Sequence, residues 1–171
     1  EPEADAFGVA CIEEGIELVE AGIDKPILLL EGFFEASELE YISEKGMWCA
    51  VHSVAQIDQI AEANLSKPIN IWLKMDSGMH RLGVHPDDYQ QAYARLKSLD
   101  NVADVVLMSH FACADELDKI ATQEQVAVFN AVTADIDEPV SLANSAGVLA
   151  WNDARRDIMR PGLMLYGATA F

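Results

Sequence analysis

Basic residues are scarce in this 171-residue chain, which has 11 lysines and arginines against 29 aspartates and glutamates and a net charge of -18. Such a surface repels phosphates, so the charge argues against nucleic acid as a partner. Many of the acidic residues fall on stretches with helical spacing. We interpret them as a solvated outer face that favours solubility.

Cysteine is scarce as well. Cys11, Cys49 and Cys113 are odd in number and show no C-x-x-C spacing, which argues against a disulfide scaffold and against a zinc site. We therefore predict no metal site and a reducing, cytoplasmic environment. A nucleophilic pair of Cys113 with His110 is an alternative, but the spacing does not place the base within hydrogen-bond reach of the thiol.

Long apolar runs are missing. No run approaches the roughly 20 residues that a membrane-spanning helix needs, and no basic-then-apolar leader opens the chain. We therefore expect no membrane partner. The opening residues 1–5 include no initiator methionine and are typical of the middle of a longer protein.

Short apolar strands alternate with amphipathic helical stretches along the chain, which is long enough to bury a core. Strands are predicted at 4–11, 26–30, 47–52, 68–75, 102–110, 139–143 and 159–166, and helices at 12–19, 36–45, 53–63, 86–96 and 118–134. This alternation predicts a parallel sheet with helical crossovers. A glycine-rich turn after the first strand is missing, which weakens a Rossmann fold. Polar residues at successive strand ends favour a (β/α)8 barrel, one strand short of closure.

The first polar group follows the apolar run 69–73, which is typical of a covered strand. Lys74, Asp76 and Arg81 lie within eight positions of this strand end, together with two glycines. Buried charges are tolerated when they are paired or bound to a ligand. The segment is therefore more typical of a site than of ordinary core.

Two further polar groups follow later strands. One is 109–112 with His110, and the other combines 144–147 with 160–163. The last two loops of a barrel often hold phosphate, and hydroxyl, amide and open glycine backbone donors suit an anion. We infer a small phosphate-bearing cofactor. Alternatives are a plain turn at 144–147, a satisfied core histidine at 110, and pairing of Arg160 with Asp157.

Together these segments resemble the barrel domain of alanine racemase, a pyridoxal-phosphate (PLP) enzyme of fold-type III. The matching stretches are 73–83, 108–112, 143–147 and 160–167, with 5–10, 13–14 and 21–23 fitting the family's second repeat. The resemblance implies that residues 1–171 are a single partial barrel domain of the α/β, (β/α)8 TIM type, matching strands 2 to 8, without the C-terminal β domain. It implies interconversion of L- and D-alanine for bacterial cell-wall peptidoglycan, in a cytoplasmic homodimer.

The resemblance also implies which residues hold the phosphate of PLP. Ser145 would contact the phosphate, together with the backbone of Gly162 and Leu163. Asn144 would shape that loop.

Further roles follow from the same resemblance. Arg160 would donate to the pyridine nitrogen, with His110 holding Arg160 in place. Arg81 would contact the cofactor's phenolic oxygen and the substrate carboxylate, and Met79 would offer that carboxylate a backbone amide. Lys74 matches a lysine that is often carbamylated in the family, and as an anion it would pair with Arg81.

The two proton-transferring groups of the family match no residue of this chain. They are the Schiff-base lysine of the first strand and a tyrosine from the partner's C-terminal domain, so we expect no catalytic residue here. We expect the chain alone to be inactive, to bind PLP weakly and to associate with another copy or with its missing pieces. Lys74 is the alternative Schiff-base lysine. Alternative functions are a non-catalytic PLP-binding barrel, a racemase for another small amino acid and a related decarboxylase, the last disfavoured by the sequence of 79–81.

Overall fold

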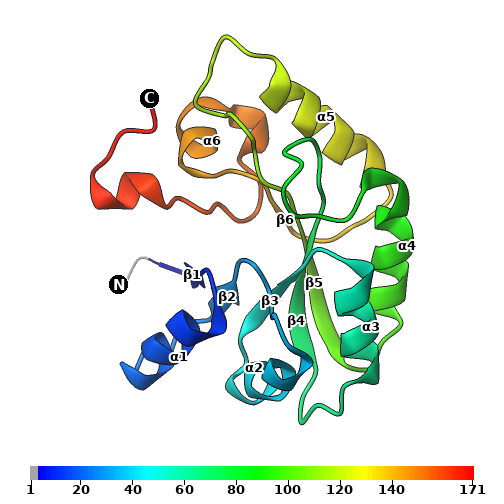
Figure 1. The fold of residues 1–171 in the computed structure, drawn as a ribbon. Helices are drawn as coiled ribbons and strands as arrows, with labels where there is room; N and C mark the ends of the chain where they lie inside the picture. The colour runs from blue at the N-terminus through cyan, green and yellow to red at the C-terminus, as the bar shows by residue number, and fades with distance from the viewer. Residues whose placement is uncertain (1–3) are drawn as a thin grey trace. The chain divides into compact units, whose positions relative to one another are not determined.

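The computed structural model describes residues 4–171, and Figure 1 labels its helices and strands. The strands are β1 (Phe7–Val9), β2 (Ile27–Leu29), β3 (Trp48–Val51), β4 (Ile69–Lys74), β5 (Val102–Met108) and β6 (Val140–Ser141). The α-helices are α1 (Ile12–Glu20), α2 (Leu39–Lys45), α3 (Val54–Glu62), α4 (Pro86–Lys97), α5 (Ala121–Val132) and α6 (Ser145–Ala150). Short 3-10 helices are η1 (Ala36–Glu38), η2 (Asn152–Ala154) and η3 (Leu163–Tyr166).

The strand order in the sheet follows the sequence from β1 to β6. The pairs β1–β2, β2–β3 and β5–β6 are parallel, and an α-helix follows every strand. Sequential parallel strands with helical crossovers are the topology of a (β/α)8 barrel. The predicted fold class, part of such a barrel, is therefore confirmed, with six strands where the sequence predicts seven.

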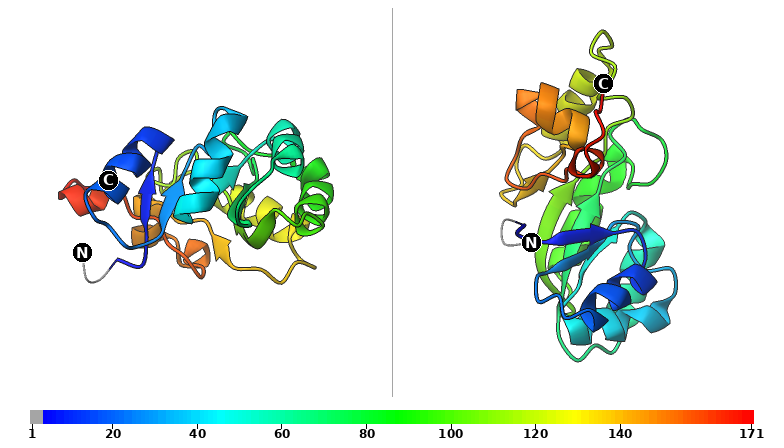
Figure 2. Two further views of the ribbon diagram at one scale, coloured as in Figure 1. Left: turned by 90° about the horizontal axis from the view of Figure 1, so that it is seen from below. Right: turned by 90° about the vertical axis from the view of Figure 1, so that its left-hand side faces the viewer.

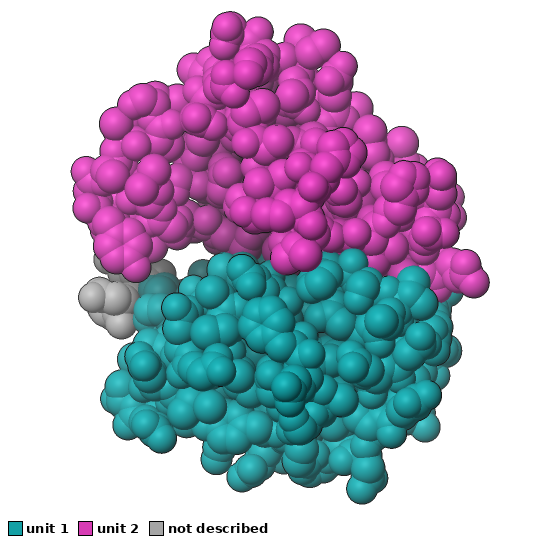
Figure 3. Space-filling model, in the orientation of Figure 1, with its two compact units in different colours: residues 1–72, 94–105 teal, residues 73–93, 106–171 magenta. Residues whose placement is uncertain are grey.

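The described chain divides into two compact units, coloured separately in Figure 3. The first contains the residues up to 72 together with 94–105. Helix α1 lies against β1 and β2 in this unit (Figure 2). Gly15 allows the close approach, because a Cβ there would lie 3.3 Å from Leu29 Cδ2 and 3.2 Å from Met47 Cε. The strands β2 and β3 supply its apolar core, with Leu29, Cys49 and their neighbours fully buried.

The second unit contains residues 73–93 and 106–171. Tyr89 of α4 is fully buried and donates its hydroxyl to the carbonyl of Leu73, at 2.8 Å. Phe129 of α5 is buried in the same unit. The carboxyl ends of β4, β5 and β6 all fall in this unit, so the polar residues that follow them do too.

The predicted strand at 159–166 is wrong. Its start makes two backbone bonds beside β6, from Ile158 to Val140 (3.2 Å) and from Arg160 to Ala143 (2.9 Å). The chain then turns into η3, in which Tyr166 is 87% exposed. An apolar segment forms a strand only where a neighbouring strand completes its backbone hydrogen bonds, and no strand pairs with 163–166 in the part of the chain that the structure describes.

Candidate active site

All sequence-predicted site residues lie in the second unit, at or just after the ends of strands or at the start of the short helices α6 and η3. They are Lys74, Met79, Arg81, His110, Asn144, Ser145, Arg160, Gly162 and Leu163. Apart from Met79, they fall into three groups, which are an anchored arginine, a serine-centred loop and a cationic cluster around a histidine.

The guanidinium of Arg160 is anchored by three acceptors. It donates to Ser141 Oγ, to the carbonyl of Ser109 at 2.7 Å and to the carbonyl of Leu142 at 3.3 Å. Ser141 Oγ gives its own proton to the carbonyl of Ile158, at 2.8 Å, and therefore acts as an acceptor for the arginine. Burial lowers the pKa of Arg160 to about 10, so the group still carries its charge at neutral pH.

Ser145 organises the loop before η3. Its Oγ accepts from the backbone amides of Gly162 (3.0 Å) and Met164 (3.2 Å). Asn144 is the N-cap of α6, with its side-chain oxygen accepting from the amide of Gly147 at 2.9 Å. The alternative of a plain turn is therefore incorrect, because 144–147 opens a helix of six residues.

His110 lies among positive charges. Burial lowers its pKa to about 4, and the charges of Arg160, Arg81 and Lys74 act in the same direction. A neutral imidazole is therefore the native form at physiological pH. Three of the chain's 11 basic residues act on one side chain, so the site favours anions even though the chain as a whole is strongly acidic.

The segment 76–83 forms a closed loop. Its base is closed by bonds from the amide of Asp76 to the carbonyl of Val84 (3.0 Å) and from the amide of Val84 to the carbonyl of Lys74 (2.8 Å). The carboxylate of Asp76 accepts from the amides of Gly78 (3.1 Å) and His80 (2.9 Å) and pairs with the His80 ring at 3.2 Å. This arrangement holds His80 at a positive φ of 57°, which non-glycine residues seldom adopt.

Met79 and Arg81, predicted to bind the substrate carboxylate, lie on this loop, and Lys74, predicted to be carbamylated, lies at its base. Lys74 is 5% exposed, Met79 is half-buried and Arg81 is exposed. The side chains of Met79 and Arg81 make no hydrogen bond to any residue that the structure describes. Arg81 and Lys74 lie close enough to His110 for their charges to lower its pKa. The side chain of Met79 makes no hydrogen bond to another predicted site residue in the described part of the chain.

Four residues of the site were missed by sequence reasoning. Ser77, Ser109, Ser141 and Gln125 are buried and bond to the loops or to Arg160. The three serines lie in or beside the strand-end motifs, so their position in the sequence could have identified them as site residues. Gln125 sits within a helix, where the pattern gives no sign of its role.

One alternative from the sequence is resolved by these contacts. Asp157 does not pair with Arg160, because its carboxylate accepts from the amide of Val140 at 2.8 Å. A cluster of three or more His, Cys, Asp or Glu side chains able to hold a metal ion is not found among residues 4–171. No helix within the described range has the length and apolarity to span a membrane.

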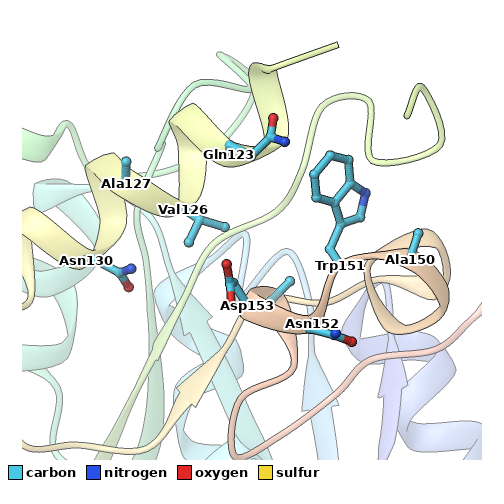
Figure 4. A pocket seen from close by; sticks show the side chains of 9 residues that line it. Gln123, Val126, Ala127, Asn130, Ala150, Trp151, Asn152 and Asp153 are labelled. Atoms are coloured by element: carbon cyan, nitrogen blue, oxygen red, sulfur yellow. The ribbon is translucent and has the colours of Figure 1, made fainter. Parts of the chain in front are cut away.

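A hollow in the same unit lies between α5 and the segment 150–154, with a volume of about 450 Å³. Figure 4 shows Trp151, Gln123 and Asn130 at its walls. The indole Nε1 of Trp151 donates to the carbonyl of Ala114 at 2.7 Å, which fixes the ring as a structural element. None of the predicted site residues lines this hollow.

Comparison with known proteins gives the family of the chain. Residues 1–170 match the family model for alanine racemase, N-terminal domain. An alanine racemase of Pseudomonas taetrolens is 59% identical over 171 residues, which is 100% of this chain and 48% of the relative. The catabolic alanine racemase of Pseudomonas aeruginosa is 56% identical over 169 residues, 99% of this chain and 47% of the relative.

The fold of the chain is also similar to that of a solved alanine racemase. The biosynthetic alanine racemase from Pseudomonas aeruginosa has a TM-score of 0.94 at 44% sequence identity and covers 99% of this chain and 47% of that structure. The chain thus spans about half the length of the relatives that it matches. It belongs to the family of alanine racemase N-terminal domains.

Proposed function

We propose that this chain forms the cofactor- and carboxylate-binding part of a PLP-dependent racemase that interconverts L- and D-alanine. The observation that carries the proposal is the anchored guanidinium of Arg160, held beside the loop of Ser145 within a chain of this family. PLP, when bound, supplies an electron sink that makes the α-proton of an amino acid removable.

The donors of the Ser145 loop fit a phosphate group. Ser145 Oγ accepts two amide bonds, so its own proton is available to an anion. The amide of Leu163 has no acceptor in the described part of the chain. A Cβ at Gly162 would meet no atom within 4 Å, so the backbone there is open to a ligand. We propose that Ser145, Gly162 and Leu163 hold the phosphate, with Asn144 fixing the start of the loop.

The donors of Arg160 fit the pyridine nitrogen of PLP. Three of its five N–H groups are used by Ser141, Ser109 and Leu142, which leaves two for a ligand. Because Arg160 keeps its proton at neutral pH, it donates a hydrogen bond without protonating the ring. A pyridine ring without a proton is a weaker electron sink than a protonated one. This suits a racemase, since the reaction returns a proton to the same carbon. We propose that neutral His110 stays beside Arg160 and avoids a further positive charge there.

The loop 76–83 suits an α-carboxylate. We propose that Arg81 binds the substrate carboxylate and the phenolic oxygen of the cofactor, and that the backbone amide of Met79 donates to the same carboxylate. Lys74 is buried close to other cations. Carbamylation would turn it into an anion that pairs with Arg81, and intact-protein mass spectrometry under conditions that preserve carbamate would detect it.

We propose that the two proton-transferring residues lie in parts of the family sequence that this chain does not match. The chain alone is then inactive. A homodimer of the full-length gene product is part of the same proposal. Light scattering of the full-length gene product tests this state, and a monomer at micromolar concentration would contradict it.

The relatives favour a catabolic role over the supply of D-alanine for peptidoglycan. Within Pseudomonas aeruginosa, identity to the catabolic racemase is higher than identity to the biosynthetic one. We propose that the protein serves growth on alanine. Deletion of the gene would then impair growth on D-alanine as carbon source without creating a requirement for D-alanine, whereas such a requirement would support the peptidoglycan role.

The full-length gene product tests the function. We expect it to bind PLP and to racemise L-alanine faster than serine or bulkier amino acids, measured by circular dichroism or chiral chromatography. Ser145→Ala should weaken the binding of PLP by about tenfold, because one charge-assisted hydrogen bond is lost, and should leave the affinity for pyridoxal unchanged. Equal loss for both ligands would contradict the phosphate assignment. No racemisation of any amino acid would contradict the proposed function.

A further inference from the structure

Gln125 of α5 has its side-chain amide bonded to two neighbouring loops. It is 3% exposed. Its Nε2 donates to Ser77 Oγ (3.3 Å) and to the carbonyl of His110 (3.1 Å), and its Oε1 accepts from the amide of Ala112 (3.0 Å). Both N–H groups and the oxygen of this buried amide are therefore hydrogen-bonded. Movement of the bonded groups is unfavourable, because each lost bond would leave a buried polar atom unpaired.

The contact with Ser77 continues as a chain of hydroxyl groups. Ser109 Oγ donates to the carbonyl of Met75 at 2.9 Å, so it accepts from Ser77 Oγ at 2.8 Å. Ser77 in turn accepts from Gln125. The carbonyl of Ser109 is also an acceptor for Arg160. The hydroxyl chain therefore connects Gln125 with the start of the loop 76–83 and with Ser109, one of the three residues that accept from Arg160.

Backbone packing at Gly78 gives independent support for the same contact. Gly78 has a φ of 138°, and a Cβ there would lie 3.2 Å from Gln125 Cγ. The loop backbone thus rests directly on the glutamine side chain, at a conformation that glycine permits. Met79 and Arg81 follow within three residues, so the place of Gln125 determines where this part of the loop begins.

We infer that Gln125 is a positioning residue that sets the carboxylate-binding loop against the segment 110–112. It acts through Ser77 and Gly78 on Met79 and Arg81, and it does not touch substrate or cofactor itself. The inference rests on the proposed function. Its consequence is kinetic, since displacement of a binding group by about 1 Å is enough to weaken the use of a substrate by up to about a hundredfold.

The test replaces Gln125 in the full-length gene product. With Gln125→Ala we expect the KM for alanine to rise by about tenfold and kcat to fall by less than about threefold, because the carboxylate contacts are weakened. The affinity for PLP should stay within about twofold of the wild type, since the phosphate donors lie on another loop. Gln123→Ala, an exposed position on the same helix, is the matched control and should leave KM and kcat unchanged.

Further variants separate hydrogen bonding from packing. Gln125→Met keeps the volume and loses the bonds, and it should raise KM as Gln125→Ala does. If neither variant folds, Ser77→Ala removes one bond with little change in packing, and its KM should rise by about threefold. A loss of thermal stability with unchanged KM would overturn the inference, because it would show a structural role alone.

Hydrogen exchange of the PLP-free protein gives a readout that does not depend on activity. Gln125→Ala should speed exchange in both segments 76–83 and 109–113, whereas Gln123→Ala should not. Unchanged exchange in these segments would overturn the inference even if the wild type proved to be no racemase. Absence of racemase activity in the wild type would instead contradict the proposed function.

Discussion

At the scale of single residues, Asp76 shows how one carboxylate organises a binding loop. Its burial acts to raise its pKa, but hydrogen bonds from the amides of His80 and Gly78, together with the charge of His80, lower it overall. The ionised form is therefore the one that the native loop selects. The cost of holding His80 at positive φ is offset by these bonds.

Replacement of Asp76 tests this account. Asp76→Ala removes the acceptor for two backbone amides and one imidazole, so we expect the free energy of unfolding to fall by about 2 kcal/mol. Urea denaturation followed by fluorescence measures the change. Asp115→Ala, at an exposed aspartate, is the control and should change the free energy by less than about 0.5 kcal/mol. Equal stability of the Asp76 variant and the wild type would contradict the account.

At the scale of elements, the helices predicted at 12–19, 53–63 and 86–96 agree within one residue at each end with α1, α3 and α4. Ser53 caps α3 by accepting from the amide of Gln56 at 3.3 Å, which is the first of the two bonds of a capping box. The reciprocal bond differs, because Gln56 Oε1 accepts from the amide of His52 at 2.9 Å and not from that of Ser53. Pro86 is the first residue of α4, a position where its missing N–H costs no helical hydrogen bond.

Other elements were outside the reach of sequence patterns. Helix α6 has six residues, too few for its periodicity to stand out from a turn. The segment 159–166 ends in the apolar run 163–166, but whether such a run forms a strand depends on neighbours far away in the sequence. The role of Gln125 depends in the same way on contacts with 77, 110 and 112. The strand-end motifs located the candidate site, whereas the long-range bonds that arrange it could not be predicted.

The cap of α3 gives a prediction at this scale. Ser53→Ala should lower the free energy of unfolding by about 1 kcal/mol, because an amide of the first turn loses its acceptor. Ser53→Asp should restore most of the loss, since aspartate caps equally well. Ser98→Ala, at an exposed serine that bonds the carbonyl of Arg95, is the matched control for chemical denaturation. A Ser53→Ala protein as stable as the wild type would show that the observed bond does not stabilise the helix.

At the scale of the whole molecule, charge is distributed unevenly between surface and site. The chain has a net charge of -18, yet Arg160, Arg81 and Lys74 all act on His110. An acidic surface with a cationic site keeps the protein soluble while it favours an anionic ligand at one place. Because of these cations and its burial, His110 is neutral in the native protein, and protonating it there is unfavourable.

The lowered pKa of His110 predicts that the free energy of unfolding depends on pH. Burial, and then the neighbouring cations, lower the pKa of His110 from 6.5 to about 4. Between these values His110 binds a proton in the unfolded chain but not in the native protein. Its contribution to the free energy of unfolding is therefore complete well above pH 6.5 and is lost as the pH drops towards 4. We expect His110 to account for a loss of about 2 kcal/mol between pH 8 and pH 5.

Urea denaturation at both pH values of wild type, His110→Gln and His85→Gln isolates this contribution. The glutamine at 110 does not titrate, so the loss between pH 8 and pH 5 should be about 2 kcal/mol smaller in that variant. Carboxylates such as Asp76 titrate in all three proteins and therefore cancel in the comparison. His85 is exposed, so its variant should keep the full loss. If His110→Gln loses as much stability as the wild type, His110 is not held neutral by burial and by the surrounding cations.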